Sequence, residues 1–292
     1  MADAFERSEH KMREHGMSDT AIAQFEHLYE VWSNEESTSW IREEEVEPIT
    51  DIPSFHDVYE TINHEKAVDA FAKTAFLKLN GGLGTSMGLD YAKSLLPVRR
   101  HKAKPMRFLD IILGQVVTAR KRLGVALPLT LMDSFRTSRD TMAAVAKDRH
   151  FEQKDVPVEI IQHVEPKIDV ATGEPVTWET NPDLEWCPPG HGDLYSTLWE
   201  SGLLDILEEQ GYRYLFISNS DNLGARPSRT LAQHFENTGA PFMIEVARRT
   251  QADRKGGHIV RDVVTGRLML REMTQVADED RADAMDIHKH PF

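Results

Sequence analysis

The stretch from Ala75 to Pro97 constrains the fold more than any other part of the chain. It begins with a short apolar run, which is typical of a buried β-strand. The run ends in a turn that is rich in glycine: Gly81, Gly82, Gly84 and Gly88. Without Cβ atoms, the backbone of such a turn can approach an anion closely and direct its N–H groups at it. We therefore expect a phosphate-binding turn, to which Lys93 adds a positive charge.

Two familiar phosphate-binding loops do not match this turn. A Walker A loop needs glycine directly before its Lys-Ser pair, whereas Ala92 precedes Lys93 here. A dinucleotide-binding fingerprint that begins at Gly82 needs glycine or alanine at the position of Met87. Neither template fits, and a glycine-rich turn without a ligand remains the alternative to a phosphate site.

Length and charge limit the classes of function. With 292 residues the chain can form one large domain or two ordinary ones. Its formal net charge of −14 argues against nucleic acids and anionic membranes as partners, because both need a basic face. A small phosphorylated substrate stays possible, since a few local cations, helix N-termini or a metal suffice to hold it.

The apolar pattern, the N-terminus and the cysteine content of the sequence together predict a cytoplasmic protein. No apolar run is long enough to span a bilayer, and the charged N-terminus lacks the apolar core of a signal peptide. The single cysteine, Cys187, allows no internal disulfide, which agrees with a reducing compartment.

The hydrophobic pattern along the chain predicts an α/β fold. Residues 1–74 are expected to form an N-terminal helical segment, with one helix capped at Ser18 and another from His56 to Thr74. Residues 75–292 are expected to form the main domain, in which strands and helices alternate. The expected helices are 108–124, 137–147, 228–237 and one around 198–207; the expected strands are 75–79, 127–132, 158–162, 214–217 and 242–246, with a hairpin at Thr265-Gly266. Such alternation predicts a parallel or mostly parallel sheet covered by helices.

Polar residues follow the strand at 214–217, where ligands bind in open α/β sheets. Asp221 is the best metal candidate in this segment, because magnesium often takes one carboxylate together with water and substrate phosphates. The alternative for Asp221 is a turn residue that bonds to nearby backbone N–H groups. Elsewhere, His191 lies between Gly190 and Gly192, so its ring is open to a phosphate or a sugar hydroxyl, although a lone histidine is more often structural.

Other reactive residues are weaker candidates. Cys187 has a histidine nearby but no third group to orient it, so a cysteine nucleophile is not expected. His288 and His290 form a single H-x-H pair without further ligands, which is weak support for zinc. Ser86 does not lie in a G-x-S-x-G nucleophile elbow.

Taken together, these motifs resemble the eukaryotic-type UTP:glucose-1-phosphate uridylyltransferases, or UDP-glucose pyrophosphorylases. The resemblance rests on five ordered motifs: LNGGLGTSMG at Leu79 with Lys93-Ser94, PPGHGDLY at Pro188, SGLLD at Ser201, FISNSDNLGA at Phe216 and KGG at Lys255. It implies a Rossmann-like, GT-A-like nucleotidyltransferase domain with helices on both faces of the sheet. It also implies a magnesium-dependent reaction in which glucose 1-phosphate attacks the α-phosphorus of UTP, giving UDP-glucose and pyrophosphate.

The resemblance also implies roles for single residues. The nucleotide-binding positions would be Leu79, Asn80, Gly81, Gly82, Lys93, Gln162 and Gly190, with Gln162 reading the edge of uracil and Lys93 acting as the catalytic residue that neutralises the UTP phosphates. The positions at the sugar phosphate would be Gly81, Gly82, His191, Asn219, Ser220 and Asp221, with Asp221 also binding Mg²⁺.

The chain departs from the family pattern at several places. Asp90-Tyr91-Ala92 stands where many relatives carry K-G-P, and Asp133 stands where relatives usually have asparagine. The chain stops at Phe292, before the further sugar-binding segment and the C-terminal β-helix domain of the family, so we expect a fragment whose catalytic domain is incomplete at its C-terminal end.

Two alternative functions remain open at this point. One is a uridylyltransferase for another sugar phosphate, such as N-acetylglucosamine 1-phosphate; those relatives tend to show G-x-G-T-R, whereas this loop has Ser86 at the last position, which favours glucose. The other is a non-catalytic nucleotide-binding module. The sequence leaves a homo-oligomer open as well.

Overall fold

The computed structural model describes residues 2–34, 40–83, 91–101 and 104–292. The chain forms two compact units, each built from two segments. Unit 1 comprises residues 1–29 and 62–237, and unit 2 comprises residues 30–61 and 238–292. Each unit combines residues from both sides of position 74.

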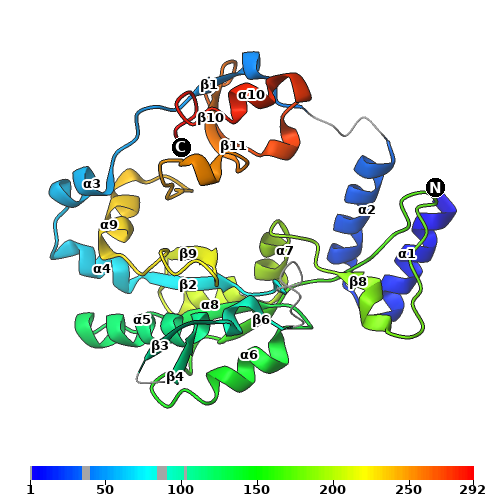
Figure 1. Ribbon diagram of the computed structural model, residues 1–292. Helices are drawn as coiled ribbons and strands as arrows, with labels where there is room; N and C mark the ends of the chain where they lie inside the picture. The colour runs from blue at the N-terminus through cyan, green and yellow to red at the C-terminus, as the bar shows by residue number, and fades with distance from the viewer. Residues whose placement is uncertain (1, 35–39, 84–90, 102–103) are drawn as a thin grey trace. The chain divides into compact units, whose positions relative to one another are not determined.

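Unit 1 contains the alternating strands and helices that the sequence predicts (Figure 1). Its elements in chain order are α1 (Ala2–Glu14), α2 (Asp19–Ser33, which continues into unit 2), α4 (Lys66–Ala72), β2 (Thr74–Leu79), η3 (Lys93–Leu95), β3 (Pro97–His101), β4 (Lys104–Arg107), α5 (Phe108–Leu123), β5 (Leu129–Asp133), α6 (Ser138–Val145), β6 (Glu159–Ile161), β7 (Glu165–Pro166), η4 (Pro182–Glu185), β8 (Trp186–Cys187), α7 (Asp193–Glu200), α8 (Leu203–Glu209), β9 (Tyr214–Asn219) and α9 (Arg229–Thr238).

A four-stranded parallel sheet organises unit 1. Its strand order is β6-β5-β2-β9, so the strand that leads into the glycine turn is an inner strand. Phe76 in β2 is in register with Leu129 in β5 on one side and with Phe216 in β9 on the other. The expected parallel sheet is therefore confirmed. Because all four strands run the same way, the turns that follow them meet at one edge of the sheet.

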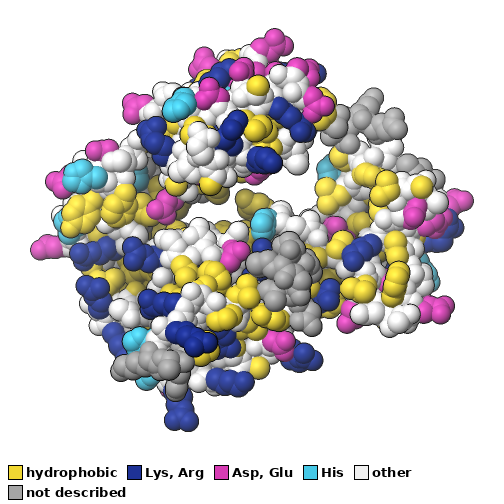
Figure 2. Space-filling model, viewed as in Figure 1, with side chains coloured by type: hydrophobic (Ala, Val, Ile, Leu, Met, Phe, Trp, Pro, Cys, Tyr) yellow, Lys and Arg dark blue, Asp and Glu magenta, His cyan; other side chains and the backbone are white. Residues whose placement is uncertain are grey.

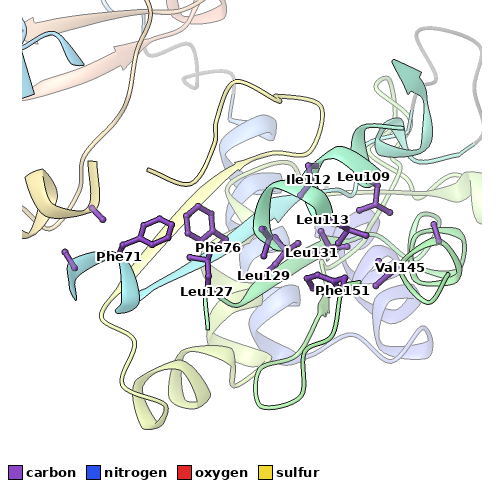
Figure 3. Close-up of a cluster of buried hydrophobic side chains, with 14 residues drawn as sticks. Phe71, Phe76, Leu109, Ile112, Leu113, Leu127, Leu129, Leu131, Val145 and Phe151 are labelled. Atoms are coloured by element: carbon purple, nitrogen blue, oxygen red, sulfur yellow. The ribbon is translucent and has the colours of Figure 1, made fainter. Parts of the chain in front are cut away.

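The sheet buries a separate cluster of apolar side chains on each face. Alternate residues of β2 divide between them: Phe76 joins one cluster, whereas Ala75 and Leu77 join the other. The first cluster packs α4, α5, α6 and α9 against the sheet, and Figure 3 shows Phe76, Leu129 and Leu131 among the helical side chains. The second cluster packs α7 and α8 against the opposite face. Helices thus cover both faces, and the two-sided burial explains the almost continuous apolar run of β2.

Helix α5 shows how local signals set an element. Leu109, Ile112, Leu113 and Val116 recur at helical spacing and are buried. The helix begins where the Asp110 side chain accepts a hydrogen bond from the backbone N–H of Arg107, and it ends at Gly124, whose φ of 68° suits glycine. Lys and Arg side chains gather over α5 and over the β3–β4 hairpin (Figure 2), so the outer side of this helix is polar.

Two expected helices are interrupted in the structure. The predicted helix from His56 to Thr74 is divided into α3 (Phe55–Thr61) and α4. Between them, the side-chain oxygen of Asn63 accepts hydrogen bonds from the backbone N–H groups of Glu65 and Lys66, which caps the second helix. The predicted helix around 198–207 is divided into α7 and α8 at Gly202, whose φ of 68° ends the first of them.

Unit 2 is built on an antiparallel sheet with the order β1-β10-β11. Its elements are η1 (Glu43–Glu45), β1 (Val46–Pro48), α3, η5 (Gln251–Asp253), β10 (His258–Asp262), β11 (Leu268–Arg271), η6 (Met273–Gln275), η7 (Asp278–Asp280) and α10 (Arg281–Ala284). The expected hairpin at Thr265-Gly266 is confirmed, because these residues join β10 to β11. The expected strand at 242–246 is wrong, since that segment has no regular secondary structure and belongs to none of the described sheets.

A buried ionic cluster supports unit 2. Arg271 is fully buried and donates to Glu43, which also accepts hydrogen bonds from Lys289 and from the Nε2 atom of His290 at 2.9 Å. Burial alone would raise the pKa of Glu43, but the hydrogen bonds from Lys289, Arg271 and His290 outweigh it and lower the pKa to about 2. His290 of the H-x-H pair is thus a partner of a carboxylate.

The helices of the described residues are all too short or too polar to cross a membrane.

Candidate active site

The carboxyl edge of the parallel sheet brings the predicted site segments together. The backbone N–H of Asn80 donates to the carbonyl of Met132 at 2.7 Å, and that of Ser220 donates to the carbonyl of Leu79 at 3.0 Å. The turn after β2 is therefore held between the ends of β5 and β9. Leu79 is half-buried, Ser220 is buried, and Asn219 is exposed at this edge.

The glycine turn lies against Gln162. A Cβ atom at Gly81 would lie only 2.6 Å from the side-chain amide carbon of Gln162, so any larger residue at this position would displace the Gln162 amide. Gly82 is exposed, and nothing within 4 Å would obstruct a Cβ atom there. Gly84 and Gly88, the other two glycines of the motif, lie outside the described residues. The structure thus places Gln162, which lies 81 residues further along the chain, over the first glycine of the turn.

Lys93 returns to the foot of the glycine turn. Leu83 and Ala92 form an antiparallel bridge, and the N–H of Lys93 donates to the carbonyl of Gly82 at 3.3 Å. The Nζ atom of Lys93 lies 3.7 Å from the Oδ2 atom of Asp221, with both side chains more than one third exposed. The structure therefore joins the predicted phosphate-binding lysine to the predicted metal-binding carboxylate.

The loop that carries Asp221 is fixed from two sides. The side-chain oxygen of Asn222 accepts hydrogen bonds from the N–H groups of Gly224 and Ala225, so Asn222, rather than Asp221, makes the turn contacts that the structure describes. Lys78 of β2 is buried and donates to the Oγ atom of Ser218 at 2.6 Å and to the carbonyl of Ala225 at 2.9 Å. Burial lowers the pKa of Lys78 to about 8.

Asn80 faces the protein interior. Its Nδ2 atom donates to the Oδ1 atom of Asp133 at 2.7 Å and to the Oγ1 atom of Thr141 at 3.1 Å. Thr137 donates to the same Asp133 oxygen at 2.9 Å. The side chain of Asn80 therefore braces the turn on β5 and α6, which leaves its backbone as the part nearest the turn surface.

Asp133 is fully buried and faces a second carboxyl group. Glu159 of β6 is its diagonal neighbour on the adjacent strand. Burial and the side chain of Glu159 raise the pKa of Asp133 to about 7, although Thr137 and Asn80 act in the opposite direction. The added acidic group at this position is thus partly protonated near neutral pH.

Gly190 and His191 lie directly before α7. Gly190 has a φ of 102°, which other residues rarely adopt, and His191 is exposed. The carbonyl of Gly190 accepts a hydrogen bond from Asp193 at 3.3 Å, and that of His191 accepts one from Leu194 at 3.2 Å. Both residues are thereby tied to the first turn of the helix.

The sequence interpretation missed His163. This residue follows Gln162, and all its described polar contacts go to α7: its backbone N–H and its Nδ1 atom contact Asp193, and its Nε2 atom contacts Glu200. Asp193 lies within the motif PPGHGDLY at Pro188. This motif was the signal in the sequence that the start of α7 belongs to the site.

The described residues beside the glycine turn offer one side chain that is suited to bind a magnesium ion. The described residues contain no group of three or more His, Cys, Asp or Glu side chains placed to hold a metal. Asp221 supplies a single exposed carboxylate beside Lys93, and magnesium commonly binds one or two carboxylates and completes its shell with water and phosphates. This donor set therefore fits magnesium bound together with a phosphorylated substrate, and does not fit a metal held by the protein alone.

The comparisons with known proteins identify the family. A family model described as UTP–glucose-1-phosphate uridylyltransferase matches residues 22–292. The chain belongs to this family. Two uridylyltransferases of the family are similar over most of the chain: one from Dictyostelium discoideum is 34% identical over 235 residues, and one from Saccharomyces cerevisiae is 37% identical over 240 residues. These matches cover 78% and 79% of this chain but only 44% and 45% of the relatives, so the chain spans less than half their length.

Solved uridylyltransferase-family structures show the same fold. The UDP-glucose pyrophosphorylase from Leishmania major is 37% identical and superimposes with a TM-score of 0.86, covering 100% of this chain and 62% of that one. A variant of the L. major enzyme, solved in complex with UDP-glucose, gives a TM-score of 0.87 at the same identity and coverage. The chain thus has the α/β nucleotidyltransferase fold of the family, as predicted from its motifs.

Proposed function

We propose that the protein transfers a uridylyl group from UTP to glucose 1-phosphate, giving UDP-glucose and pyrophosphate. The observation that supports this most strongly is the meeting of Lys93 and Asp221, at 3.7 Å, beside the glycine turn of a chain that belongs to the uridylyltransferase family. The complex of the L. major relative with UDP-glucose supports the choice of sugar nucleotide. A cytoplasmic location is part of the same proposal.

The proposed reaction exchanges one phosphorus–oxygen bond for another. A phosphate oxygen of glucose 1-phosphate attacks the α-phosphorus of UTP, and the bond from this phosphorus to the β-phosphate oxygen breaks, releasing pyrophosphate. Transfer of this kind needs alignment and neutralisation of charge more than a covalent nucleophile. This matches a site whose described residues offer a lysine and backbone N–H groups in place of an activated cysteine or serine.

Backbone groups and side chains would together align the substrates. The backbone of Leu79, Asn80, Gly81 and Gly82 would hold the nucleotide phosphates, and Lys93 would neutralise them. Gln162, whose side chain lies against Gly81, would hydrogen-bond the edge of uracil. Gly190 and His191 would contact the nucleotide and the sugar phosphate from the start of α7, and Asn219 and Ser220 would complete that side of the site. Asp221 would hold Mg²⁺, which offsets the negative charge of the phosphates when bound.

Release of pyrophosphate from UTP tests the proposal. The chain is incubated with UTP, Mg²⁺ and either glucose 1-phosphate or N-acetylglucosamine 1-phosphate, and binding of UTP and UDP-glucose is measured in parallel by calorimetry. We expect release that depends on glucose 1-phosphate. A preference for N-acetylglucosamine 1-phosphate would reassign the sugar, binding without turnover would indicate a nucleotide-binding module, and neither binding nor turnover would refute the proposal.

A further inference from the structure

We propose that His163 is a positioning residue for the nucleotide site: it clamps the segment that carries Gln162 onto the first turn of α7, directly behind His191. The inference rests on the proposed function, because it assumes that these two segments contact one nucleotide. It adds a residue that the motifs of the family did not single out.

Three hydrogen bonds hold His163 to α7. Its backbone N–H donates to the Oδ2 atom of Asp193 at 2.8 Å, its ring Nδ1 atom lies 2.6 Å from the Oδ1 atom of Asp193, and its Nε2 atom lies 3.0 Å from the Oε2 atom of Glu200. The side chain of Asp193 is 1% exposed and that of His163 is 12% exposed, so water competes little for these bonds.

The ring bridges two carboxylates and is therefore a cation when the clamp is complete. Ionised carboxylates only accept hydrogen bonds, so both ring nitrogens must carry protons to bond to both of them. The hydrogen bond that His163 donates to Asp193 raises the pKa of His163 most, burial opposes it, and the charges of Asp193 and Glu200 add to the rise. Glu165 of β7 also faces this group, and burial together with the charge of Asp193 raises the pKa of Glu165 to about 7.

Gln162 is held by contacts on both sides, and the clamp at His163 provides one of them. On one side, its backbone N–H donates to the carbonyl of Asp133 at 2.8 Å, and its amide lies over Gly81. On the other side, the next residue, His163, is bound to Asp193, whose own N–H donates to the carbonyl of Gly190. Gln162 and the turn that presents His191 are thus connected through a single buried side-chain pair.

The clamp extends to the N-terminal helices. Glu200 uses its other oxygen, Oε1, to accept a hydrogen bond from the hydroxyl of Ser18 at 2.9 Å. Ser18 also caps α2, because its hydroxyl accepts a hydrogen bond from the N–H of Ala21. The position of α7 is therefore set from both ends by residues outside the helix, which makes its first turn a rigid support.

Substitution of His163 should weaken nucleotide binding and leave turnover nearly unchanged. His163→Phe keeps the ring volume but removes both side-chain bonds, and we expect about tenfold weaker binding of UDP-glucose by calorimetry. Turnover at saturating substrates should stay within about twofold, since the reacting atoms keep their contacts. His163→Asn retains a donor for Asp193 and should recover part of the affinity. The matched control is Tyr29→Phe, which removes a buried hydrogen bond to the carbonyl of Gly173 in the same unit, away from the clamp.

The pH profile separates the clamp from a purely structural role. Because the pKa of His163 is raised above its ordinary value of 6.5, the affinity of the wild type for UDP-glucose should fall as the pH rises through the raised pKa. UDP-glucose has no terminal phosphate that titrates in this range. His163→Phe should bind with a flatter profile, in which only the titration of neighbouring groups such as Glu165 remains. Should this variant fold poorly, Glu200→Gln provides the same test, with about threefold weaker binding expected from the loss of one charged partner.

Unchanged affinity for UDP-glucose in folded His163→Phe, or in Glu200→Gln, would overturn the inference while leaving the proposed function intact. Failure of the wild type to bind UTP or UDP-glucose would instead refute the proposed function.

Discussion

The Nζ atom of Lys93 and the Oδ2 atom of Asp221 lie 3.7 Å apart, although 127 positions separate them in the chain. Lys93 follows the glycine turn, and Asp221 follows β9, which pairs with β2 along its whole length. The parallel pairing of these two strands brings the two charges together. This cation and this carboxylate are the basis of the proposed site for a magnesium complex of a nucleoside triphosphate.

Replacing Lys93 by alanine should remove most of the activity but lower the stability of the fold only slightly. Removal of a lysine that neutralises transferring phosphates should lower kcat at least about a hundredfold. Its ion pair with Asp221 is long, at 3.7 Å, and both side chains are more than one third exposed, so the free energy of unfolding should fall by about 0.5 kcal/mol or less. Pyrophosphate release and urea unfolding measure the two effects.

Lys73→Ala is the matched control for this variant. Lys73 also pairs with one carboxylate, that of Glu236, and it lies just before β2, at the opposite end of the strand. We expect a similar small loss of stability and no change in kcat. Equal activity of the Lys73 and Lys93 variants would contradict the role given to Lys93.

Asp221→Asn should increase the magnesium requirement. The amide keeps the size of the side chain but removes the charge that attracts the cation, so the magnesium concentration for half-maximal activity should rise about tenfold. A magnesium titration of pyrophosphate release measures this. Glu236→Gln is the control, because the carboxylate of Glu236 pairs with Lys73, which precedes β2 at the end opposite the glycine turn. An unaltered titration in Asp221→Asn would rule out this carboxylate as a ligand.

Asp133→Asn should change how stability depends on pH. The pKa of Asp133 is raised from 3.8 to about 7, so the native state binds more protons than the unfolded chain between these values. The wild type should therefore lose stability as the pH rises through that window, on the order of 2 kcal/mol between about pH 5 and pH 8. Asparagine can still accept the bonds from Asn80 and Thr137, and its amide can donate to Glu159. Urea unfolding across this range should give a flatter curve for the variant; an identical slope would show that Asp133 ionises normally.

Glu43→Gln should destabilise unit 2. The change leaves the buried guanidinium of Arg271 without its strongest partner, which costs roughly 3 kcal/mol. Because the pKa of Glu43 is lowered from 4.5 to about 2, its contribution is complete above 4.5 and is lost as the pH falls towards 2. Thermal unfolding at several acidic pH values compares the variant with Glu44→Gln, an exposed neighbour in the same short helix. A variant as stable as this control would show that the cluster contributes nothing net.

The sequence predicted best those elements whose signals are local. The β2 strand, the cap of α2 at Ser18 and the end of α5 at Gly124 each follow from a few neighbouring residues, and the structure confirms them. The helix expected across Asn63 was wrong because one side-chain oxygen there competes for backbone N–H groups. The strand expected at 242–246 was wrong because its apolar residues found no partner strand within the described chain.

Predicting the site was possible only where residues belong to a motif. The glycine turn, His191 and Asp221 each lie in a short segment of recognisable composition. The contacts of His163 with Asp193 and Glu200 depend on the chain after β6 meeting both ends of α7, thirty and thirty-seven residues further along, and no local pattern encodes that meeting. The same holds for the carboxyl pair of Asp133 and Glu159, which only the register of β5 and β6 reveals.

The two-segment construction of unit 2 imposes an order on biosynthesis. Residues 30–61 leave the ribosome early, yet β1 pairs with β10, and Glu43 needs Arg271 and His290 as partners. Until those residues have been translated, the β1 segment and the carboxylate of Glu43 must remain in the nascent chain without their partners. Unit 1 can meanwhile complete its parallel sheet as soon as β9 emerges. Unit 1 is therefore free to fold first, and unit 2 can close only after its second segment, residues 238–292, has been synthesised.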